Sequence, residues 1–439
     1  MSTSYAEHFA ALGSEGSGPS FLAPMRRDAL ARFASYGFPT PRNEDWHFTS
    51  PAPIAESSFE PMRPMAVAPG RQDLVPWLLG GRDWPLLVFV NGRFTPSLST
   101  IDSLPAGVRA MSLVSALHEE PTLVERHLGR LASYNDPAFA FTALNTALMR
   151  DGAVVHVSRD AASDVPLHLL FLTDAAADGG VTHPRNLLVV ERHAKISVIE
   201  QYASLTTARY LANPVTEAVV EDGATLHHYR LQRESPRAFH TGHVETRLGR
   251  DAHYVSFAFA TGAELSRTNI YATLGGDGCG ATLNGLYMLD GTQHADHQTR
   301  IEHVQPNCYS REVYKGILDG ESHGVFNGKV YVHPAAQKTD GKQTNNTLLL
   351  SERARIDTKP QLEIFADDVK CTHGATVGRL DAISAFYMQS RGVTAETTRR
   401  LLTYAFAAEV LETIPLLPLR TALEALTLAR YAGEGSRGG

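Results

Sequence analysis

Residues 362–378 read Leu-Glu-Ile-Phe-Ala-Asp-Asp-Val-Lys-Cys-Thr-His-Gly-Ala-Thr-Val-Gly, and no other stretch of the chain is as informative. It places a thiol, Cys371, and an imidazole, His373, two residues apart on a segment that we expect to be extended. Alternate residues of a strand point to the same face, and at about 3.3 Å of rise per residue their Cα atoms lie roughly 7 Å apart. Such a pair suits joint binding of one metal or sulfur atom.

This stretch ends a long strand-rich region that runs from Ala153 to about Arg391. Short runs rich in Val, Ile, Thr and Tyr alternate there with turn clusters, and we identify no helical pattern between them. The turn clusters lie at 221–223, 249–251, 275–278, 290–291 and 319–320. About 240 residues of irregularly spaced strands fit either a large sandwich or a parallel solenoid. No fixed repeat period is visible to decide between them.

The N-terminal part mixes helices with a hairpin. Apolar residues recur at helical spacing over 21–36, and Gly37-Phe38-Pro39 ends that helix. Residues 136–149 are expected to be helical as well. Residues 86–94 predict a β-hairpin, because Asn91-Gly92 is the strongest two-residue turn signal between apolar runs.

The C-terminal part turns helical at Gly392, with Thr394 as the expected N-cap. Apolar residues then follow at spacings of one, three and four, and they are Leu401, Leu402, Ala405, Phe406, Val410, Leu411 and Ile414. We expect Pro415 and Pro418 to end this helix and a second helix to span 421–431. The Gly-Ser-Arg-Gly-Gly tail is expected to be disordered.

A chain of 439 residues is too long for one compact core. We expect an N-terminal, mostly helical domain over 1–150, a strand-rich core over 151–391 and a helical region over 392–439. The net charge of −7, without a visible cluster of Lys and Arg, argues against a nucleic-acid partner. The N-terminus lacks a secretion signal, and no stretch approaches the roughly 20 apolar residues of a membrane helix. The protein is expected to be soluble and cytoplasmic.

Three cysteines, Cys279, Cys308 and Cys371, are an odd and sparse set. A disulfide framework is not expected, so the thiols are predicted to be reduced. A conventional iron-sulfur cluster needs about four protein ligands. This chain therefore cannot hold a standard four-cysteine cluster alone.

Several motifs resemble the SufB/SufD family of the SUF iron-sulfur cluster assembly machinery. Besides 362–378, they are Tyr-Lys-Gly-Ile-Leu (314–318), Val-Phe-Asn-Gly-Lys (325–329), Ala-Gln-Lys-Thr-Asp-Gly-Lys-Gln (336–343) and Asn-Thr-Leu-Leu-Leu-Ser (346–351). The resemblance is dense from about 195 to 410 and thins towards the N-terminus. There, residues 44–49 look like the family's Glu-x-Trp-x-Tyr-Thr element, with Phe for Tyr. The Thr-His-Gly-Ala-Thr run at 372–376 favours the SufD branch, because SufB carries a Glu-His-Glu type sequence and more cysteines.

The resemblance implies a mainly β fold, a right-handed parallel β-helix flanked by an N-terminal α/β region and a C-terminal helical region. It also implies that His373 lies at the interface with a SufB-like paralogue, where it would be a metal ligand. With Cys371 it would form a candidate site for a transient iron-sulfur cluster shared with SufB and not held by this chain alone. The residues by themselves favour an inert pair that faces a packed core, because buried free Cys and hydrogen-bonded His are both common.

The resemblance further implies that the C-terminal helices dock the ABC-type ATPase SufC, through Leu401, Leu402, Phe406, Val410 and Leu411. The simpler interpretation is that these helices cap the solenoid. No Gly-x-x-x-x-Gly-Lys-Ser/Thr motif is present, so ATP is expected to bind another subunit, and Gly275 to Gly280 form a tight turn. The resemblance also implies that the chain forms a homodimer in the absence of SufB.

The preferred hypothesis is a non-catalytic scaffold subunit of a SufBCD complex. The alternative is a stand-alone β-helix carbohydrate-active enzyme that uses carboxylates such as Asp367, although Asp367 and Asp368 are adjacent and would face opposite ways on a strand. His294, His297 and His303 have a spacing that suggests a metal site. Strand alternation, however, sends His294 to the other face, so we expect them to be structural.

Overall fold

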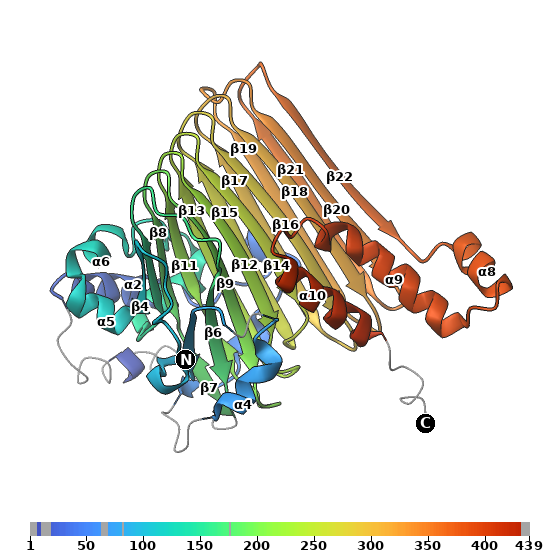
Figure 1. Cartoon of the computed structure of the whole chain (residues 1–439), viewed down its shortest axis with the longest axis horizontal. Coiled ribbons are helices and arrows are strands. Elements are labelled where there is room, and N and C mark those ends of the chain that lie inside the picture. Colours follow the sequence, from blue (N-terminus) through green and yellow to red (C-terminus); the bar gives the residue numbers. More distant parts are fainter. Residues whose placement is uncertain (1–6, 10–18, 63–68, 81–82, 175–176, 432–439) are drawn as a thin grey trace.

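Pairs of strands repeat along the middle of the chain and stack into a parallel β-solenoid of about eight turns (Figure 1). The computed structural model describes residues 7–9, 19–62, 69–80, 83–174 and 177–431. It is mainly β, with 40% strand and 25% helix, and helices lie towards both ends of the chain. The parallel β-helix core that the family resemblance implied is thus confirmed, and the sandwich is excluded. The glycine-rich C-terminal tail lies outside the described residues.

Each coil contributes one strand to each of two sheets. The first sheet runs in the order β21 (Arg355–Ile364), β19 (His323–Val332), β17 (His294–His303), β15 (Leu265–Leu274), β13 (Phe239–Leu248), β11 (Val215–Val220), β8 (Arg185–Val190), β5 (Ala153–Val157) and β4 (Val108–Ser112). Short strands β1 (Glu60–Pro61), β7 (Gly180–Thr182) and β10 (Leu211–Ala212) join its side. Only the β4–β5 pair of this sheet is antiparallel.

The second sheet lies opposite and ends in the predicted hairpin. Its order is β22 (Lys370–Gly378), β20 (Asp340–Leu349), β18 (Tyr309–Leu318), β16 (Gly280–Leu289), β14 (His253–Ala260), β12 (Thr225–Arg233), β9 (Lys195–Ser204), β6 (Leu167–Thr173), β2 (Leu86–Val90) and β3 (Arg93–Phe94). Strands β2 and β3 pair antiparallel across Asn91 and Gly92, which confirms the hairpin.

The repeat has a variable length, which hid it in the sequence. Leu265 pairs with His294 and His294 with His323, a step of 29 residues each time. The next step in the same sheet, from His323 to Arg355, takes 32 residues. The strands stay in register because the additional residues are accommodated in the turns, so the sequence shows no constant period.

One row of turns has a common left-handed conformation. His193, Gly223, Asp251, Gly278 and Asn307 all have φ between 53° and 72°. Each donates its backbone N–H to a carbonyl in the turn of the following coil, at 2.8–3.2 Å. Gly, Asn and Asp adopt this conformation most readily, which explains the turn clusters seen in the sequence.

Side chains from the inner faces of both sheets fill the solenoid. Alternate residues of each strand point inward, and they include the buried rings of Tyr254, Tyr287, Tyr314 and Phe326. Polar residues are also buried there, and they are described below.

Helices from both ends of the chain flank the solenoid. The N-terminal ones are α2 (Leu22–Tyr36), α3 (Ala52–Ala55), α4 (Arg71–Leu74), α5 (Leu113–Glu119), α6 (Pro121–His127) and α7 (Ala140–Leu148), and the C-terminal ones are α8 (Ala382–Ser390), α9 (Ala395–Leu411) and α10 (Leu417–Arg430). The helices predicted over 21–36 and 136–149 are confirmed as α2 and as α7 with the 3₁₀ turn before it.

The structure differs from the sequence-based prediction at two points in the C-terminal helices. Helix α8 was not predicted, although Asp381 caps it by accepting hydrogen bonds from the backbone N–H groups of Ile383 and Ser384. Pro418 does not end a helix but lies in the first turn of α10, where a missing N–H costs nothing. Thr394 is confirmed as the N-cap of α9, because its side chain accepts from the Thr397 N–H.

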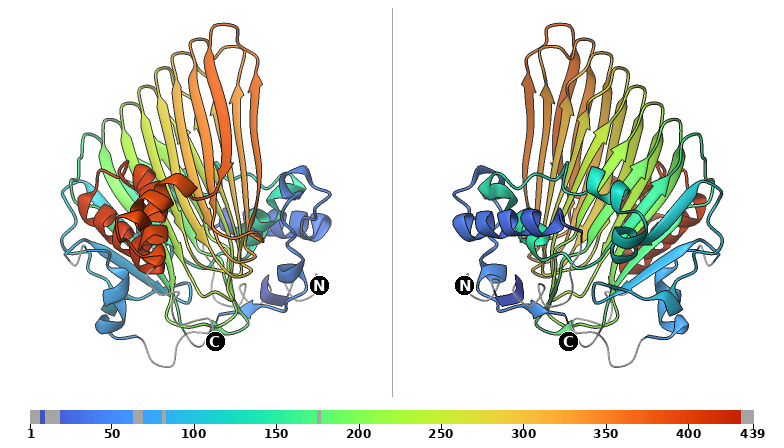
Figure 2. Two further views of the ribbon diagram at one scale, coloured as in Figure 1. Left: turned by 90° about the vertical axis from the view of Figure 1, so that its right-hand side faces the viewer. Right: turned by 90° about the vertical axis from the view of Figure 1, so that its left-hand side faces the viewer.

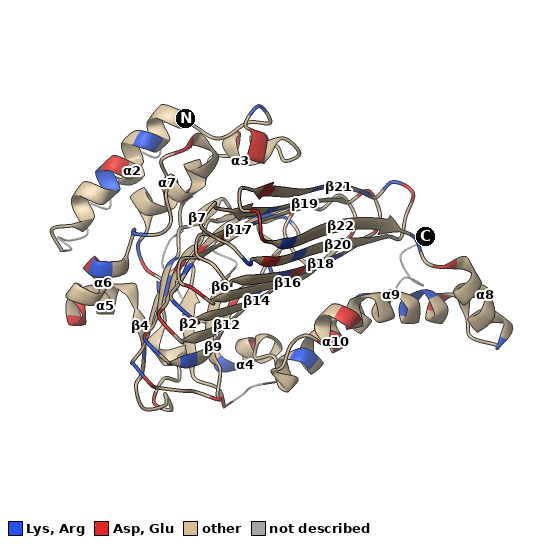
Figure 3. Ribbon diagram, turned by 90° about the horizontal axis from the view of Figure 1, so that it is seen from above, with Lys and Arg blue, Asp and Glu red and all other residues tan. Residues whose placement is uncertain are grey.

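Helices α9 and α10 lie along the outer face of the second sheet, whereas α8 extends away from both sheets (Figure 3). Leu411 and Leu423 of these helices pack into one buried cluster with Tyr229, Phe257 and Leu286 of the sheet. Helices α9 and α10 therefore shield these apolar residues on the outer face of the second sheet from solvent.

Candidate functional site

The last coil of the solenoid leaves its inner side uncovered. Strands β21 and β22 end the two sheets, and no described element lies beyond them (Figure 2). Every described residue of β22 except Cys371 is exposed, and β21 has no fully buried residue. In β20, the neighbour of β22, buried residues alternate with partly buried or exposed ones. Val377, for example, is 50% exposed. An edge strand of this length normally needs a cover, because its N–H and C=O groups remain free to pair.

Cys371 and His373 point to the interior side of this open coil. In the register of β20 and β22, Cys371 lies beside Gly341 and His373 lies beside Gln343. Gly341 and Gln343 are buried. Neighbours in parallel register share a face, so the two candidate ligands lie on one face, as predicted.

The two residues differ in their surroundings. Cys371 is partly buried and packs beside Val330, Leu362 and Ala366, and this burial raises the pKa of its thiol. His373 is exposed. Within the described ranges, no group of three or more His, Cys, Asp or Glu side chains is placed to hold a metal ion. The described part of the chain thus offers two candidate ligands here, and a cluster would need others.

A buried polar pair lies beneath His373. Gln343 Nε2 donates a hydrogen bond of 2.6 Å to Glu312 Oε2, and both side chains are 2% exposed. Burial raises the pKa of Glu312 to about 7. Sequence reasoning missed Glu312, because its neighbour in the fold is 31 residues away in the chain.

The predicted partner-binding residues separate into two groups. Val410 and Leu411 are at most 1% exposed and pack against the solenoid, so they serve the core and leave no surface for a partner. Leu402 and Phe406 are partly buried, and Leu401 is 40% exposed.

Helix α8 carries the more exposed apolar surface. Ile383 is 79% exposed, Phe386 74% and Tyr387 58%. Large apolar side chains grouped in this way typically mark an interaction site. Because helix α8 was not predicted, these residues were not among the expected contacts.

A lysine fixes α9 to the second sheet. Lys315 of β18 is 2% exposed, and its Nζ donates to the Phe406 carbonyl at 3.0 Å and to the carboxylate of Glu409. Its Nζ also lies 4.5 Å from the centre of the Phe406 ring. Lys315 belongs to the 314–318 motif, so part of that motif is explained by helix docking.

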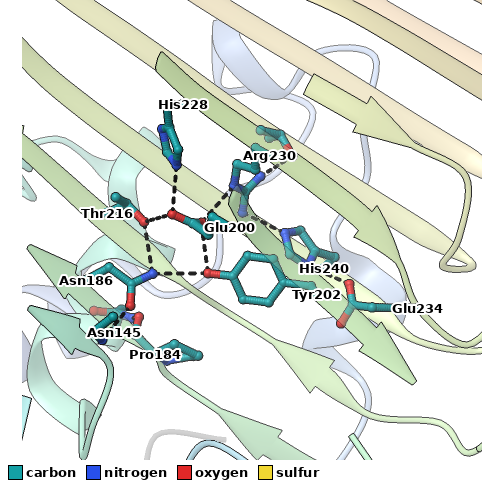
Figure 4. Close-up of polar contacts among 12 residues, drawn as sticks. Asn145, Pro184, Asn186, Glu200, Tyr202, Thr216, His228, Arg230, Glu234 and His240 are labelled. Carbon is teal, nitrogen blue, oxygen red and sulfur yellow. Dashed lines mark hydrogen bonds and ion pairs between the residues drawn. The ribbon is translucent and has the colours of Figure 1, made fainter. Parts of the chain in front are cut away.

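The interior of the solenoid holds a charged network around Glu200 (Figure 4). The Glu200 carboxylate contacts His228 Nε2 at 3.1 Å and accepts hydrogen bonds from Arg230 Nε at 3.1 Å, Tyr202 OH at 2.9 Å and Thr216 Oγ1 at 2.8 Å. Burial alone would raise the pKa of Glu200, but the hydrogen bond with His228 and the charges of His228 and Arg230 outweigh it and lower that pKa. These groups satisfy one another, which identifies the network as part of the core.

The remaining candidates do not form a site. His297 and His303 face the interior, whereas His294 faces outward and contacts Thr49 at 2.9 Å, as strand alternation predicted. Asp367 and Asp368 lie in the turn before β22 and not on a strand, so the argument from opposite strand faces does not apply to them. Among the described helices, none is long and apolar enough to cross a membrane.

Fold and site together define a class, a two-sheet parallel β-solenoid with one uncovered end that displays a thiol and an imidazole, and with helices docked along one face. Residues 171–406 match the family described as SUF system FeS cluster assembly, SufBD core domain, and residues 3–169 match the SufBD protein N-terminal region. The chain belongs to the SufBD family of SUF iron-sulfur cluster assembly proteins.

Its relatives match over most of their lengths. The chain is 34% identical to an iron-sulfur cluster assembly SufBD family protein of Synechocystis, with 92% of this chain and 90% of the relative covered. It is 33% identical to the iron-sulfur cluster assembly protein SufD of Escherichia coli, with 89% of each covered. To SufD of Bacillus subtilis it is 27% identical, with 91% of each covered.

Proposed function

We propose that this chain is a cytoplasmic, non-catalytic scaffold subunit of a SufBCD-type complex. In this proposal the uncovered coil pairs with the solenoid of a SufB-like paralogue, and the C-terminal helices receive a SufC-like ATPase. The observation that carries it is the exposure of β22 on a side that is buried in every preceding coil. Strand pairing with a second solenoid would satisfy the free edge and cover Val377.

A transient iron-sulfur cluster would then form where the two solenoids meet. His373 supplies an imidazole nitrogen and Cys371 a sulfur, both suitable ligands for iron. The SufB-like partner would provide the remaining ligands, because the described residues bring no third candidate ligand to this pair. If a SufB-like partner is absent, two copies of this chain could cover each other's open ends.

The ATPase contact is assigned to α8 and the exposed side of α9. Ile383, Phe386, Tyr387 and Leu401 are the exposed apolar residues there. Val410 and Leu411 support this surface from below by holding α9 against the sheet.

The cluster site is tested in the reconstituted complex by measuring cluster assembly from its visible absorption. His373→Ala should reduce assembly at least several-fold. Thr372→Ala, on the opposite face of the same strand, is the matched control and should assemble clusters at the parent rate. Undiminished assembly by the His373→Ala complex would refute the site and leave the scaffold role intact.

The docking surface is tested by co-purification with the two partners. Ile383→Asp combined with Phe386→Asp should abolish capture of the ATPase, because it places charge on the apolar contact, and should leave capture of the SufB-like partner unchanged. Ala substitutions of Val410 and Leu411 are unsuitable, since they would damage the core. Full retention of the ATPase by the double variant would exclude α8 as its docking site.

A further inference from the structure

Two of the three cysteines stack on successive coils. Cys279 directly precedes β16 and Cys308 directly precedes β18, and the following residues, Gly280 and Tyr309, are register partners. Their Sγ atoms are 3.6 Å apart, and the side chains are 0% and 1% exposed. The coil step places these thiols in contact although 28 residues separate them in the chain.

The residue that directly precedes a strand of the second sheet is small and buried in several coils. In the three preceding coils the equivalent residues are Ala194, Ala224 and Ala252, each buried to within 1%. A small apolar side chain therefore suffices for packing at this corner. Packing alone does not require two thiols in neighbouring coils.

The geometry is compatible with a covalent bond. Adjacent parallel strands are about 4.8 Å apart, within the 4.4–6.8 Å range of Cα separations found in disulfides. The Sγ–Sγ distance of 3.6 Å is a van der Waals contact that side-chain rotation can shorten to a bond of about 2.05 Å.

The thiols lie just beneath the surface. The carbonyl oxygen of Gly276 lies within hydrogen-bond distance of both sulfur atoms, 3.0 Å from Cys279 Sγ and 3.3 Å from Cys308 Sγ. Gly276 also lines an open groove of about 600 Å³ between α6 and the turns of the solenoid. One backbone segment without a side chain thus separates the sulfur atoms from a solvent-filled groove.

The two thiols are not equivalent. The hydrogen bond between them lowers the pKa of Cys308 and raises that of Cys279. The lowered pKa favours Cys308 as the attacking thiolate, and the 3.6 Å contact places Cys279 to react with it afterwards.

We propose that Cys279 and Cys308 form a disulfide when a hydroperoxide reaches them through this groove, which makes the corner an oxidation site that staples two coils. The Cys308 thiolate attacks the distal peroxide oxygen, the O–O bond breaks, and Cys308 becomes a sulfenic acid. The Cys279 sulfur then displaces the sulfenic oxygen, which leaves as water. For hydrogen peroxide, two thiols are oxidised by two electrons and two waters form.

The test uses the full chain, purified with reductant, freed of it and treated with a stoichiometric amount of hydrogen peroxide. After quenching, denaturation and alkylation, the parent should carry one alkyl group in place of three. Trypsin should release a linked pair of peptides, 268–300 and 301–311, while 371–379 remains separate and alkylated.

Matched variants make the result specific. Cys279→Ala and Cys308→Ala each introduce alanine, the residue found at this position in the three preceding coils, so both variants should fold. Neither should give the linked peptides. Cys371→Ser should give them as the parent does. The oxidised parent should also unfold at a higher temperature than the reduced one, because the bond restrains the unfolded chain.

Three results would overturn the proposal. They are three free thiols in the folded parent after peroxide, a link that includes Cys371, and a link that appears only after denaturation. The test needs no partner, so its outcome is independent of the proposed scaffold function.

Discussion

His373 and Gln343 are register partners on neighbouring parallel strands, yet Gln343 is 2% exposed and His373 lies in solvent. Both side chains point to the same face of the second sheet. The difference arises only because β20 is followed by another coil and β22 is not. The imidazole therefore occupies a position that the fold fills with core residues elsewhere.

The buried charge network predicts a large stability effect at Arg230. Arg230→Met should lower the free energy of unfolding by about 3–5 kcal/mol, because it removes the guanidinium that pairs with the buried Glu200 carboxylate. Urea unfolding measures the change. Arg192→Met, which removes an exposed pair with Asp222, is the control and should have a much smaller effect. Equal effects of the two variants would contradict the prediction.

Buried histidines predict a loss of stability in acid. Burial lowers the pKa of His297 to about 4, below the value of about 6.5 expected in the unfolded chain. The unfolded state therefore binds the proton first, so this contribution is complete above pH 6.5 and is lost as the pH falls from 6.5 towards 4. His168, His294 and His303 have the same shift.

His297→Phe tests this contribution, because His297 contacts the rings of Tyr287 and Tyr314 and a Phe ring can replace it. Thermal unfolding between pH 7 and pH 4.5 should show a shallower decline for the variant than for the parent. His118→Gln, at an exposed position, should follow the parent. Parallel curves for the parent and His297→Phe would show that His297 does not contribute.

The contacts of Lys315 are expected to hold helix α9 against the second sheet. Lys315→Met should keep the aliphatic packing and remove the contacts with the Phe406 carbonyl and Glu409. Amide hydrogen exchange should become faster in α9 and α10 and stay unchanged in β12 and β14. Lys342→Met, an exposed lysine on the neighbouring strand β20, should leave exchange in α9 unchanged.

The contacts of Glu217 are expected to hold residues 129–132 of the N-terminal part against the solenoid. Its carboxylate accepts hydrogen bonds from the backbone N–H groups of Gly129, Leu131 and Ala132 at 2.7–3.0 Å and from Arg185 Nη2 at 2.6 Å. Glu217→Ala should destabilise the chain by about 3–5 kcal/mol, because Arg185 is then buried without its partner. Exchange at 128–132 should increase. Glu245→Ala, in the next coil, should have a much smaller effect.

Local sequence signals were sufficient for many elements. The cap at Thr394, the Asn91-Gly92 turn and the period of α2 each depend on a few neighbouring residues, and all three are as predicted. Helix α8 was missed because its nine residues follow a strand directly and show little amphipathic pattern. The repeat was missed because the coil length varies.

The sequence by itself determined the strand-rich core, the helical ends and the motifs of the SufBD family, because these depend on neighbouring residues or on resemblance. Only the tertiary structure decided which residues meet across coils. Stacking brings Cys279 to Cys308, Glu200 to Arg230 and Glu312 to Gln343, each across one coil of the solenoid. The lengths of the turns set these pairings, and the absence of a further coil among the described residues leaves His373 exposed at the open end.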